Sequence, residues 1–393
     1  MQKKIIEEVT SSRSVLLVEK QVQSIENNGY KVKVVCNKEF DKIYDENSMN
    51  SPSHERRNNI FKDIRSLYNL TRYLNKEQPD IVNFCTPKVG IMGMAAGCLN
   101  HIKTRVYVQS GLHSAADRRL KKAFLYSTER LTCLLSTHVI VTSDSLEQEL
   151  MQQKIVNPRK VVRISRGISN GIDLEKFNNA NLDNEKQEVL KDTLGIGPSD
   201  FVIGYVGKLT KGKGVNELVE AFEKLSSEYN HLKLLLIGNF EDNDPAGKVV
   251  KERIINNSNI FHHPKITDVE YYYNMMNLFV FPCQQKELGI VSLEAQAMRV
   301  PVVTFNSPGT RDALMPNTTG LITENNTSES LGESIEYLIE NPKIRKRMVQ
   351  DTRPFVLENF EKKRMEEQLF EFYDAIREQD NYEIEENHQV TDT

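Results

Sequence analysis

Short apolar runs alternate with amphipathic stretches through the first part of the chain. Apolar runs that predict strands occupy residues 30–36, 80–85, 104–109 and 139–142. Between the first two strands, residues 60–74 place apolar side chains at three- and four-residue steps, which predicts a helix. A second helix is predicted over 89–99, between the second and third strands. This alternation is typical of β-α-β units and a parallel sheet.

A second alternating run begins at residue 201, with strands predicted at 201–206, 232–237, 278–281 and 300–304. The polar, weakly patterned stretch before it is typical of a linker, and the last helix is amphipathic. An acidic segment follows that helix. We therefore predict five parts: a first α/β domain (1–178), a linker (179–200), a second α/β domain (201–360), a C-terminal helix (361–378) and a disordered tail (379–393).

Charge and cysteine content exclude several classes of function. The chain has 393 residues, with 51 Lys and Arg against 55 Asp and Glu, so its net charge of −4 disfavours nucleic-acid binding through a broad basic surface. Its five cysteines form no C-x-x-C pair, which argues against a zinc site or a disulfide framework. The sequence lacks both a long apolar run and a signal peptide, so we predict a cytoplasmic protein.

The first candidate for chemistry is the loop after the strand at 201–206. Gly207 ends the strand, and three lysines follow it, Lys208, Lys211 and Lys213, before a helix begins near Val215. Backbone amides and ammonium groups in such a loop can face an anion. It is not a Walker loop. A solvated βα turn is the alternative interpretation.

The second candidate is the segment 281–303, where a helix opens near Gly289. The amides of Gly289, Ile290 and Val291 would be free to bind a phosphate at the helix N-terminus. Glu294, one turn further on, could accept both hydroxyls of a ribose. Alternatively, Glu287 and Glu294 only stabilise the helix by interacting with the positive end of its dipole, and they bind no ligand.

Together these two segments resemble the C-terminal domain of the family 4 glycosyltransferases, retaining enzymes of the GT-B fold. The family's G-R-L-x-x-x-K-G element matches residues 207–214, with Lys208 in place of arginine, and its E-G-F-G-[IL]-V-x-L-E-A element matches residues 288–295. The segment 169–177, SNGIDLEKF, matches the entry into the second domain. The resemblance covers residues 30–347 and implies two Rossmann-like domains facing a cleft, with the C-terminal helix crossing back to the first domain.

The sequence departs from the family pattern at both sides of that cleft. Aligned on Glu294, the family's first glutamate falls on Lys286, so either Glu287 supplies the carboxylate through a one-residue loop shift or an ammonium replaces the acid. We favour Glu287. In the first domain, Ser110 stands where the family often has a histidine, and His113 follows three residues later, so these two are the acceptor-side candidates.

The resemblance implies a site made of two groups of residues. Glu287, Lys208 and Lys213 are the expected catalytic residues. The expected donor-binding residues are Gly207, Gly289, Ile290, Val291 and Glu294. A nucleotide-sugar enters as substrate, with UDP the expected nucleotide, and neither a metal nor a further cofactor is expected. The Asp242-Asn243-Asp244 triplet is interpreted as a turn.

A basic segment suggests where the acceptor comes from. Arg118, Arg119, Lys121, Lys122 and Arg130 surround the apolar residues 123–126, a composition that suits an anionic membrane surface and a lipid-linked acceptor. A solvated helix face is the alternative.

The function we predict is a retaining transfer of an N-acetylhexosamine from a UDP-sugar to a lipid-linked or saccharide acceptor in bacterial capsule or exopolysaccharide assembly. The reaction would take place in the cytoplasm at the inner face of the membrane, in an oligomer or beside a partner glycosyltransferase. The alternatives are a GT-B protein that binds a nucleotide-sugar without turnover and a GT-B sugar-nucleotide epimerase.

Overall fold

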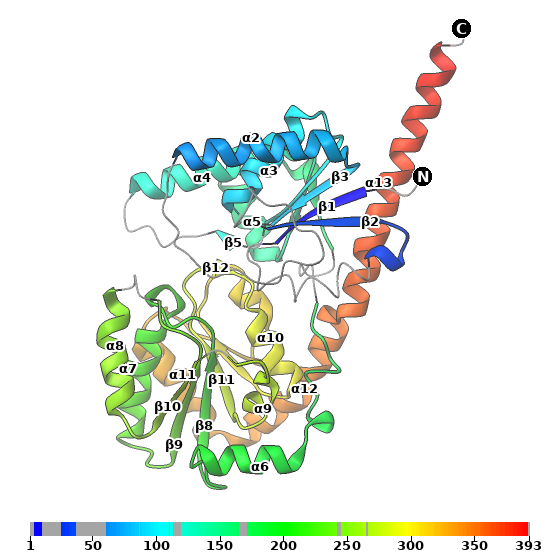
Figure 1. Cartoon of the computed structure of the whole chain (residues 1–393). Coiled ribbons are helices and arrows are strands. Elements are labelled where there is room, and N and C mark those ends of the chain that lie inside the picture. Colours follow the sequence, from blue (N-terminus) through cyan, green and yellow to red (C-terminus); the bar gives the residue numbers. More distant parts are fainter. Residues whose placement is uncertain are drawn as a thin grey trace.

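The computed structural model describes nine stretches of the chain: residues 4–9, 25–36, 60–85, 87–109, 111–112, 119–164, 171–241, 245–264 and 266–391. Two α/β domains lie one above the other in Figure 1, with the short strands β5 (Gly111–Leu112) and β12 (Lys286–Glu287) between them. Each domain contains a six-stranded parallel sheet, which confirms the predicted pair of doubly wound domains.

The first domain is built on a sheet of order β2-β1-β3-β4-β6-β7. Its strands are β1 (Lys4–Val9), β2 (Lys31–Cys36), β3 (Ile81–Phe84), β4 (Thr104–Gln109), β6 (His138–Val141) and β7 (Val161–Val162). The connecting helices are α2 (Ile60–Glu77), α3 (Pro87–Leu99), α4 (Arg119–Leu135) and α5 (Asp144–Gln152). Neighbouring strands pair in parallel, for example Ile5 with Val32 and with Ile81.

The second domain repeats this plan with the order β10-β9-β8-β11-β13-β14. Its strands are β8 (Phe201–Val206), β9 (Leu232–Ile237), β10 (Ile260–His263), β11 (Leu278–Phe281), β13 (Val302–Thr304) and β14 (Gly320–Ile322). Its helices are α7 (Val215–Ser226), α8 (Pro245–Asn256), α9 (Val269–Tyr273), α10 (Ile290–Ala297) and α11 (Ser328–Glu340). The almost entirely apolar β8, β9 and β11 fit strands that are covered on both faces.

The direction in which strands are added reverses between β8 and β11, because β9 and β10 extend the sheet on one side and β13 and β14 on the other. In doubly wound sheets, the crevice at such a switch point, beyond the carboxyl ends of the strands, is where ligands bind. The two loops singled out in the sequence follow these two strands.

The predicted linker is structured and packs on the second domain. Residues 179–200 contain the 3₁₀ turn η2 (Asn179–Asn181) and helix α6 (Asn184–Thr193). The side chain of Asp183 caps α6 by accepting from the amide of Glu185 at 2.9 Å. Gln187 donates from Nε2 to the carbonyl of Tyr271 at 3.1 Å, which fixes α6 to the second domain.

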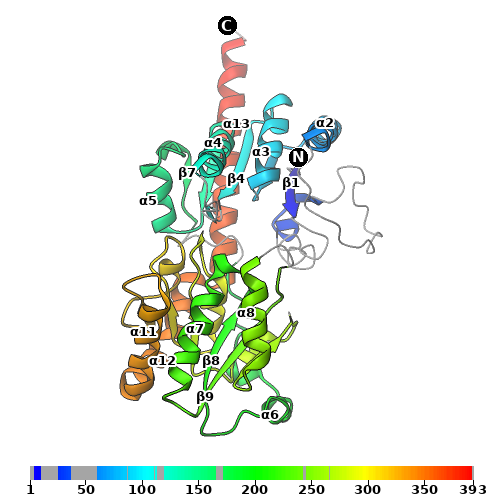
Figure 2. The same ribbon diagram turned by 90° about the vertical axis from the view of Figure 1, so that its left-hand side faces the viewer.

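The C-terminal helices return the chain to the first domain, as Figure 2 shows. Helix α12 (Pro342–Phe360) ends at an extended Glu361, and α13 (Lys362–Thr391) then crosses to the first sheet. There the hydroxyl of Tyr30 donates to Asp374 at 2.7 Å, and Tyr373 is fully buried. The predicted crossing is confirmed. Residues 379–391, predicted as a disordered tail, continue α13, since its Glu- and Gln-rich sequence favours helix extension once a packed helix has formed.

Candidate active site

Glycines bring the loops beyond β8, β9 and β11 into direct backbone contact. Gly207 and Gly238 have φ values of +150° and +148°, and a Cβ on Gly238 would lie 1.7 Å from the carbonyl oxygen of Gly207. Gly214, with φ +73°, caps the N-terminus of α7, and a Cβ there would lie 1.9 Å from the carbonyl oxygen of Pro282. A side chain at either position would separate the loops.

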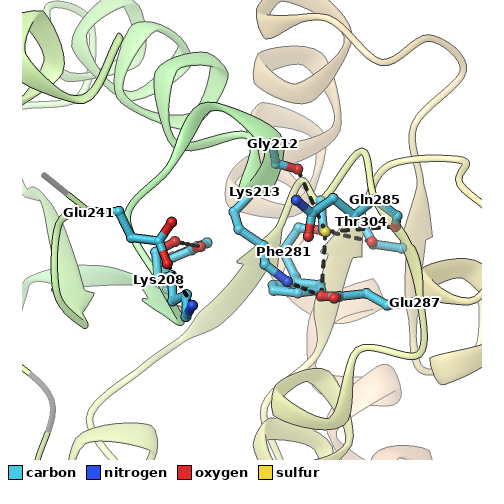
Figure 3. A network of polar contacts seen from close by, with 10 residues as sticks. Lys208, Gly212, Lys213, Glu241, Phe281, Gln285, Glu287 and Thr304 are labelled. Atoms are coloured by element: carbon cyan, nitrogen blue, oxygen red, sulfur yellow. Dashed lines mark hydrogen bonds and ion pairs between the residues drawn. The ribbon is translucent and has the colours of Figure 1, made fainter. Parts of the chain in front are cut away.

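Lys213 and Glu287 meet at the switch point. The ammonium group of Lys213, at the end of the 3₁₀ turn η3 (Lys211–Lys213), forms an ion pair with the carboxylate of Glu287 (Figure 3). The two side chains are 16% and 30% exposed, so the pair is partly shielded from water. The Lys213 Nζ also lies 5.8 Å from the centre of the Phe281 ring. The structure thus brings two of the three predicted catalytic residues together.

Lys208, the third predicted catalytic residue, is directed elsewhere in this structure. Its Nζ lies 2.5 Å from Oε1 of Glu241 in an exposed ion pair, and Figure 3 shows this pair beside the Lys213–Glu287 pair rather than within it. The backbone of Lys208 is fixed, because the buried Tyr205 donates its hydroxyl to the Lys208 carbonyl at 2.8 Å.

Cys283 contacts the ion pair of Lys213 and Glu287. The fully buried Sγ is 3.6 Å from Oε1 of Glu287 and 3.8 Å from the carbonyl of Gly212. Burial, and secondly the charge of Glu287, raise the pKa of the Cys283 thiol to about 12, so it stays protonated and can donate to the carboxylate. The sequence analysis did not select Cys283, although its place two residues after β11 could have indicated it.

Helix α10 supplies the remaining predicted donor-binding residues. Gly289 is its N-cap, and no side chain in the described part of the chain caps it. The amide of Ile290, predicted to be free, instead bonds to the carbonyl of Leu288 at 3.0 Å, because the chain turns tightly before the helix. Glu294 accepts from the hydroxyl of Tyr273 at 2.9 Å, and burial raises its pKa from 4.5 to about 7.

Known protein families match this chain over both of its domains. The family model described as Glycosyltransferase Family 4 matches residues 17–176, and that described as Glycosyl transferases group 1 matches residues 186–354. The capsular polysaccharide biosynthesis glycosyltransferase CapM of Staphylococcus aureus is 32% identical over 377 residues, which cover 95% of this chain and 97% of CapM. The chain belongs to glycosyltransferase family 4.

Solved structures share the fold of this family 4 glycosyltransferase. A glycosyltransferase of Rickettsia africae aligns with a TM-score of 0.73 at 21% identity, covering 95% of this chain and 98% of its own. Anabaena HepE in complex with UDP-glucose aligns with a TM-score of 0.73 at 16% identity, covering 95% and 99%. These similarities confirm the GT-B fold, and membership of a transferase family argues against the epimerase alternative.

The predicted acceptor-side residues Ser110 and His113 lie outside the described residues, and so do Arg118 and, in the second domain, the triplet 242–244. The neighbouring strand β5 is described. It pairs antiparallel with β12, with Gly111 opposite Glu287. The first domain therefore contacts the backbone of the candidate catalytic carboxylate directly.

A buried polar network holds the backbone of Gly111 through the side chain of Gln109. Gln109, which is fully buried, accepts from the Gly111 amide at 2.9 Å and donates to its carbonyl at 3.1 Å. The same Gln109 amide donates to the buried Glu129 at 2.9 Å, and Tyr107 donates its hydroxyl to that carboxylate at 2.7 Å. Burial raises the pKa of Glu129. This network fixes β5, which pairs with β12, to the end of β4. The sequence analysis did not find it.

Among the described residues, no group of three or more His, Cys, Asp or Glu side chains could hold a metal ion. Among the same residues, no helix is long and apolar enough to cross a membrane.

Proposed function

We propose that this family 4 transferase moves a sugar from a UDP-sugar to an acceptor hydroxyl with retention of configuration. The observation that carries the proposal is the ion pair between Lys213 and Glu287 at the switch point, beside the N-terminus of α10. The pair supports the proposal because a cation and a carboxylate close together would suit the two halves of a nucleotide-sugar, an anionic diphosphate and a sugar.

The chemistry follows from the family resemblance, and the charges of the site agree with it. The bond between the anomeric carbon and the diphosphate oxygen breaks, a bond from the acceptor oxygen to that carbon forms on the same face, and the acceptor proton passes to the departing phosphate oxygen. Lys213 and the amides near Gly289 stabilise the negative charge that develops on the diphosphate. Lys208 would join them after leaving Glu241. Glu287 would face the sugar, and Glu294 the ribose.

The kind of sugar and pathway are inferred from relatives. CapM is named for capsular polysaccharide biosynthesis, and it matches nearly the full length of this chain, so we place the chain in surface-polysaccharide assembly. The structure of HepE with UDP-glucose supports a UDP-sugar as donor, through a shared fold. The choice of an N-acetylhexosamine rests on the family resemblance.

A lipid-linked acceptor is supported by the outer surface of α4. Phe124, Leu131 and Leu134 are 71%, 44% and 68% exposed there, whereas the acid of this helix, Glu129, is buried. The exposed surface thus combines apolar side chains with the basic Arg130. The predicted membrane residues Arg119, Lys121 and Lys122 belong to the same helix. Such a surface suits an anionic membrane.

Vesicle binding tests this acceptor side. We expect the protein to sediment with phosphatidylglycerol vesicles more than with phosphatidylcholine vesicles, and Phe124→Ser with Leu134→Ser to weaken that binding. Val189→Ser is the matched control, because Val189 is 61% exposed on α6 of the second domain. Equal binding by all three proteins would contradict the membrane role of α4.

Donor binding and turnover test the transfer itself. The purified protein is titrated with UDP, GDP, ADP and a panel of UDP-sugars, and UDP release is followed with membrane extract as acceptor. We expect selective binding of UDP and release from one sugar, and we expect Lys213→Ala to lower the rate about a hundredfold. Lys224→Ala, an exposed lysine on α7, is the control.

The same experiment separates the remaining alternative. A protein that binds UDP-sugars but never releases UDP would be a nucleotide-sugar-binding partner without turnover. A protein that binds none of these nucleotides would contradict the donor site at the switch point.

A further inference from the structure

Lys286 stands where the family pattern has its first glutamate, and its side chain crosses between the domains. Its ammonium group forms an ion pair with Glu149 on α5 of the first domain. Each side chain is only 18% exposed. A charge so shielded from water is costly without its partner, so the position of each residue depends on the other.

Helix α5 holds the second domain at another point one turn earlier. Ser145 donates from its backbone amide and from its hydroxyl to Oδ2 of Asp312, at 2.8 and 2.6 Å. The amide of Gly309 in turn donates to the Ser145 hydroxyl oxygen at 2.7 Å. Ser145 and Glu149 are four residues apart and therefore lie on one face of α5, which contacts the second domain at two points.

These two points lie on either side of Glu287. Lys286 precedes it in β12, and Gly309, with φ +90°, packs so closely that a Cβ there would lie 2.4 Å from the Glu287 carbonyl carbon. On the third side, Gly111 of β5 pairs with Glu287. Gly111 of the first domain and two second-domain residues, Lys286 and Gly309, which contact the first domain, thus enclose the backbone that carries the candidate catalytic carboxylate.

We propose that Lys286 is a positioning residue: its ion pair with Glu149 holds Glu287 toward Lys213 when the two domains come together. This inference rests on the proposed function. The contacts of β12 link domain closure to the geometry of the site, so that Glu287 is in place for transfer only when the domains are docked. We place Lys286 outside the reacting groups, because its ion pair with Glu149 is shielded from water, unlike the exposed pair of Lys208.

Exchange of the two charges tests the inference. Lys286→Glu and Glu149→Lys each place like charges opposite one another, and we expect each to lower kcat about a hundredfold, as small misplacements of catalytic groups do. The KM for the donor should change less than about threefold, because Lys213 and α10 are untouched. The double variant restores opposite charges and should recover most of kcat, as should Lys286→Arg.

The matched control is an ion pair that does not join the two domains. Lys186 and Asp268 are about half exposed and 2.6 Å apart, and Lys186→Glu should leave kcat unchanged. Thermal unfolding of every variant checks that the fold is retained. If the single reversals leave kcat unchanged, or the double variant recovers nothing although it is folded, the inference is wrong.

Hydrogen exchange gives a readout that does not depend on turnover. The peptide covering residues 284–290 should exchange faster in either single variant than in the unaltered protein, and the double variant should protect it again. If the unaltered protein shows no transfer but exchange follows this pattern, the proposed function fails and the positioning of β12 stands. If transfer occurs but exchange is the same in all variants, the positioning role fails alone.

Discussion

The two domains meet in two regions of opposite character. In one region, α13 packs on the first sheet with buried apolar side chains, and the rings of Tyr373 and Tyr30 lie 5.9 Å apart. In the other, where α5 meets the second domain, the contacts are polar: Lys286 pairs with Glu149, and Ser145 binds Asp312. Apolar contacts tolerate small displacements, whereas hydrogen bonds weaken steeply with distance and angle. The first region therefore holds the domains together, and the second sets their geometry.

The largest expected effect is a loss of stability when the apolar region is disrupted. Tyr373→Ala removes a fully buried ring and its hydrogen bond from Asn83 at 3.1 Å. We expect the free energy of unfolding, measured with urea, to fall by about 3–5 kcal/mol. The rate of transfer per folded molecule should be almost unchanged. Tyr337→Ala, an exposed tyrosine on α11, is the control and should change stability by less than about 0.5 kcal/mol.

The next effect is on rate rather than stability. Glu287→Gln keeps the shape of the side chain and removes its charge, so the rate constant of transfer should fall about a hundredfold in a single-turnover assay of UDP release. The affinity for UDP, measured by calorimetry, should not weaken, because Lys213 loses a competing anion. A variant with full transfer would contradict the assignment of Glu287, and one with weaker UDP binding would contradict the division of roles.

A smaller effect comes from pH at Glu294, a predicted donor-binding residue. Because burial raises the pKa of Glu294 to about 7, the carboxylate that would accept the ribose hydroxyls forms between pH 6 and 8. Binding of UDP-N-acetylglucosamine should therefore strengthen up to about tenfold over that range. Glu294→Gln should remove the dependence, and an unchanged profile would exclude Glu294 as its source.

The same shift has a consequence for stability with the opposite sign. The unfolded state loses the Glu294 proton near pH 4.5 and the folded state only near pH 7, so between these values the folded state binds more protons. The free energy of unfolding should therefore fall as pH rises through this window, and Glu294→Gln should lessen that fall.

The smallest expected effect concerns the exposed ion pair of Lys208. Glu241→Gln releases Lys208, whose ammonium group can then turn toward a bound diphosphate, and UDP affinity should rise by up to about threefold. Calorimetry at low and high salt checks the cause, since added salt should abolish the gain. Weaker UDP binding in this variant would mean that Glu241 itself supports the nucleotide.

Local patterns in the sequence predicted most of the fold. Apolar runs located β8, β9 and β11 to the residue, because strands covered on both faces are almost entirely apolar, and the predicted bounds of β4 match as well. The pattern did not locate α6, whose sequence is polar and which packs through Gln187. Helix α13 was placed by its apolar face, but its far end was not, because helix extension beyond a packed segment leaves no periodic signal.

The site was predictable where it is local in sequence. Lys213 and the segment around Gly289 lie within two continuous motifs, and the structure places them at one switch point. The contacts that span long separations could not be inferred, such as Ser145 with Asp312 and Lys286 with Glu149. Polar pairs of this kind depend on how two domains dock, and no repeat or spacing in a single chain records that.

The return of α13 affects how the protein is made. The chain passes between the domains twice at one place, where the Ile172 amide bonds to the Phe360 carbonyl at 2.8 Å and the Lys362 amide bonds to the Ile172 carbonyl at 3.1 Å. The residues that cover the first sheet are therefore translated after the whole second domain. N-terminal domains generally fold first during synthesis, but part of the first sheet stays uncovered until α13 has been made. Synthesis of α13, rather than emergence of residue 178, completes the first domain.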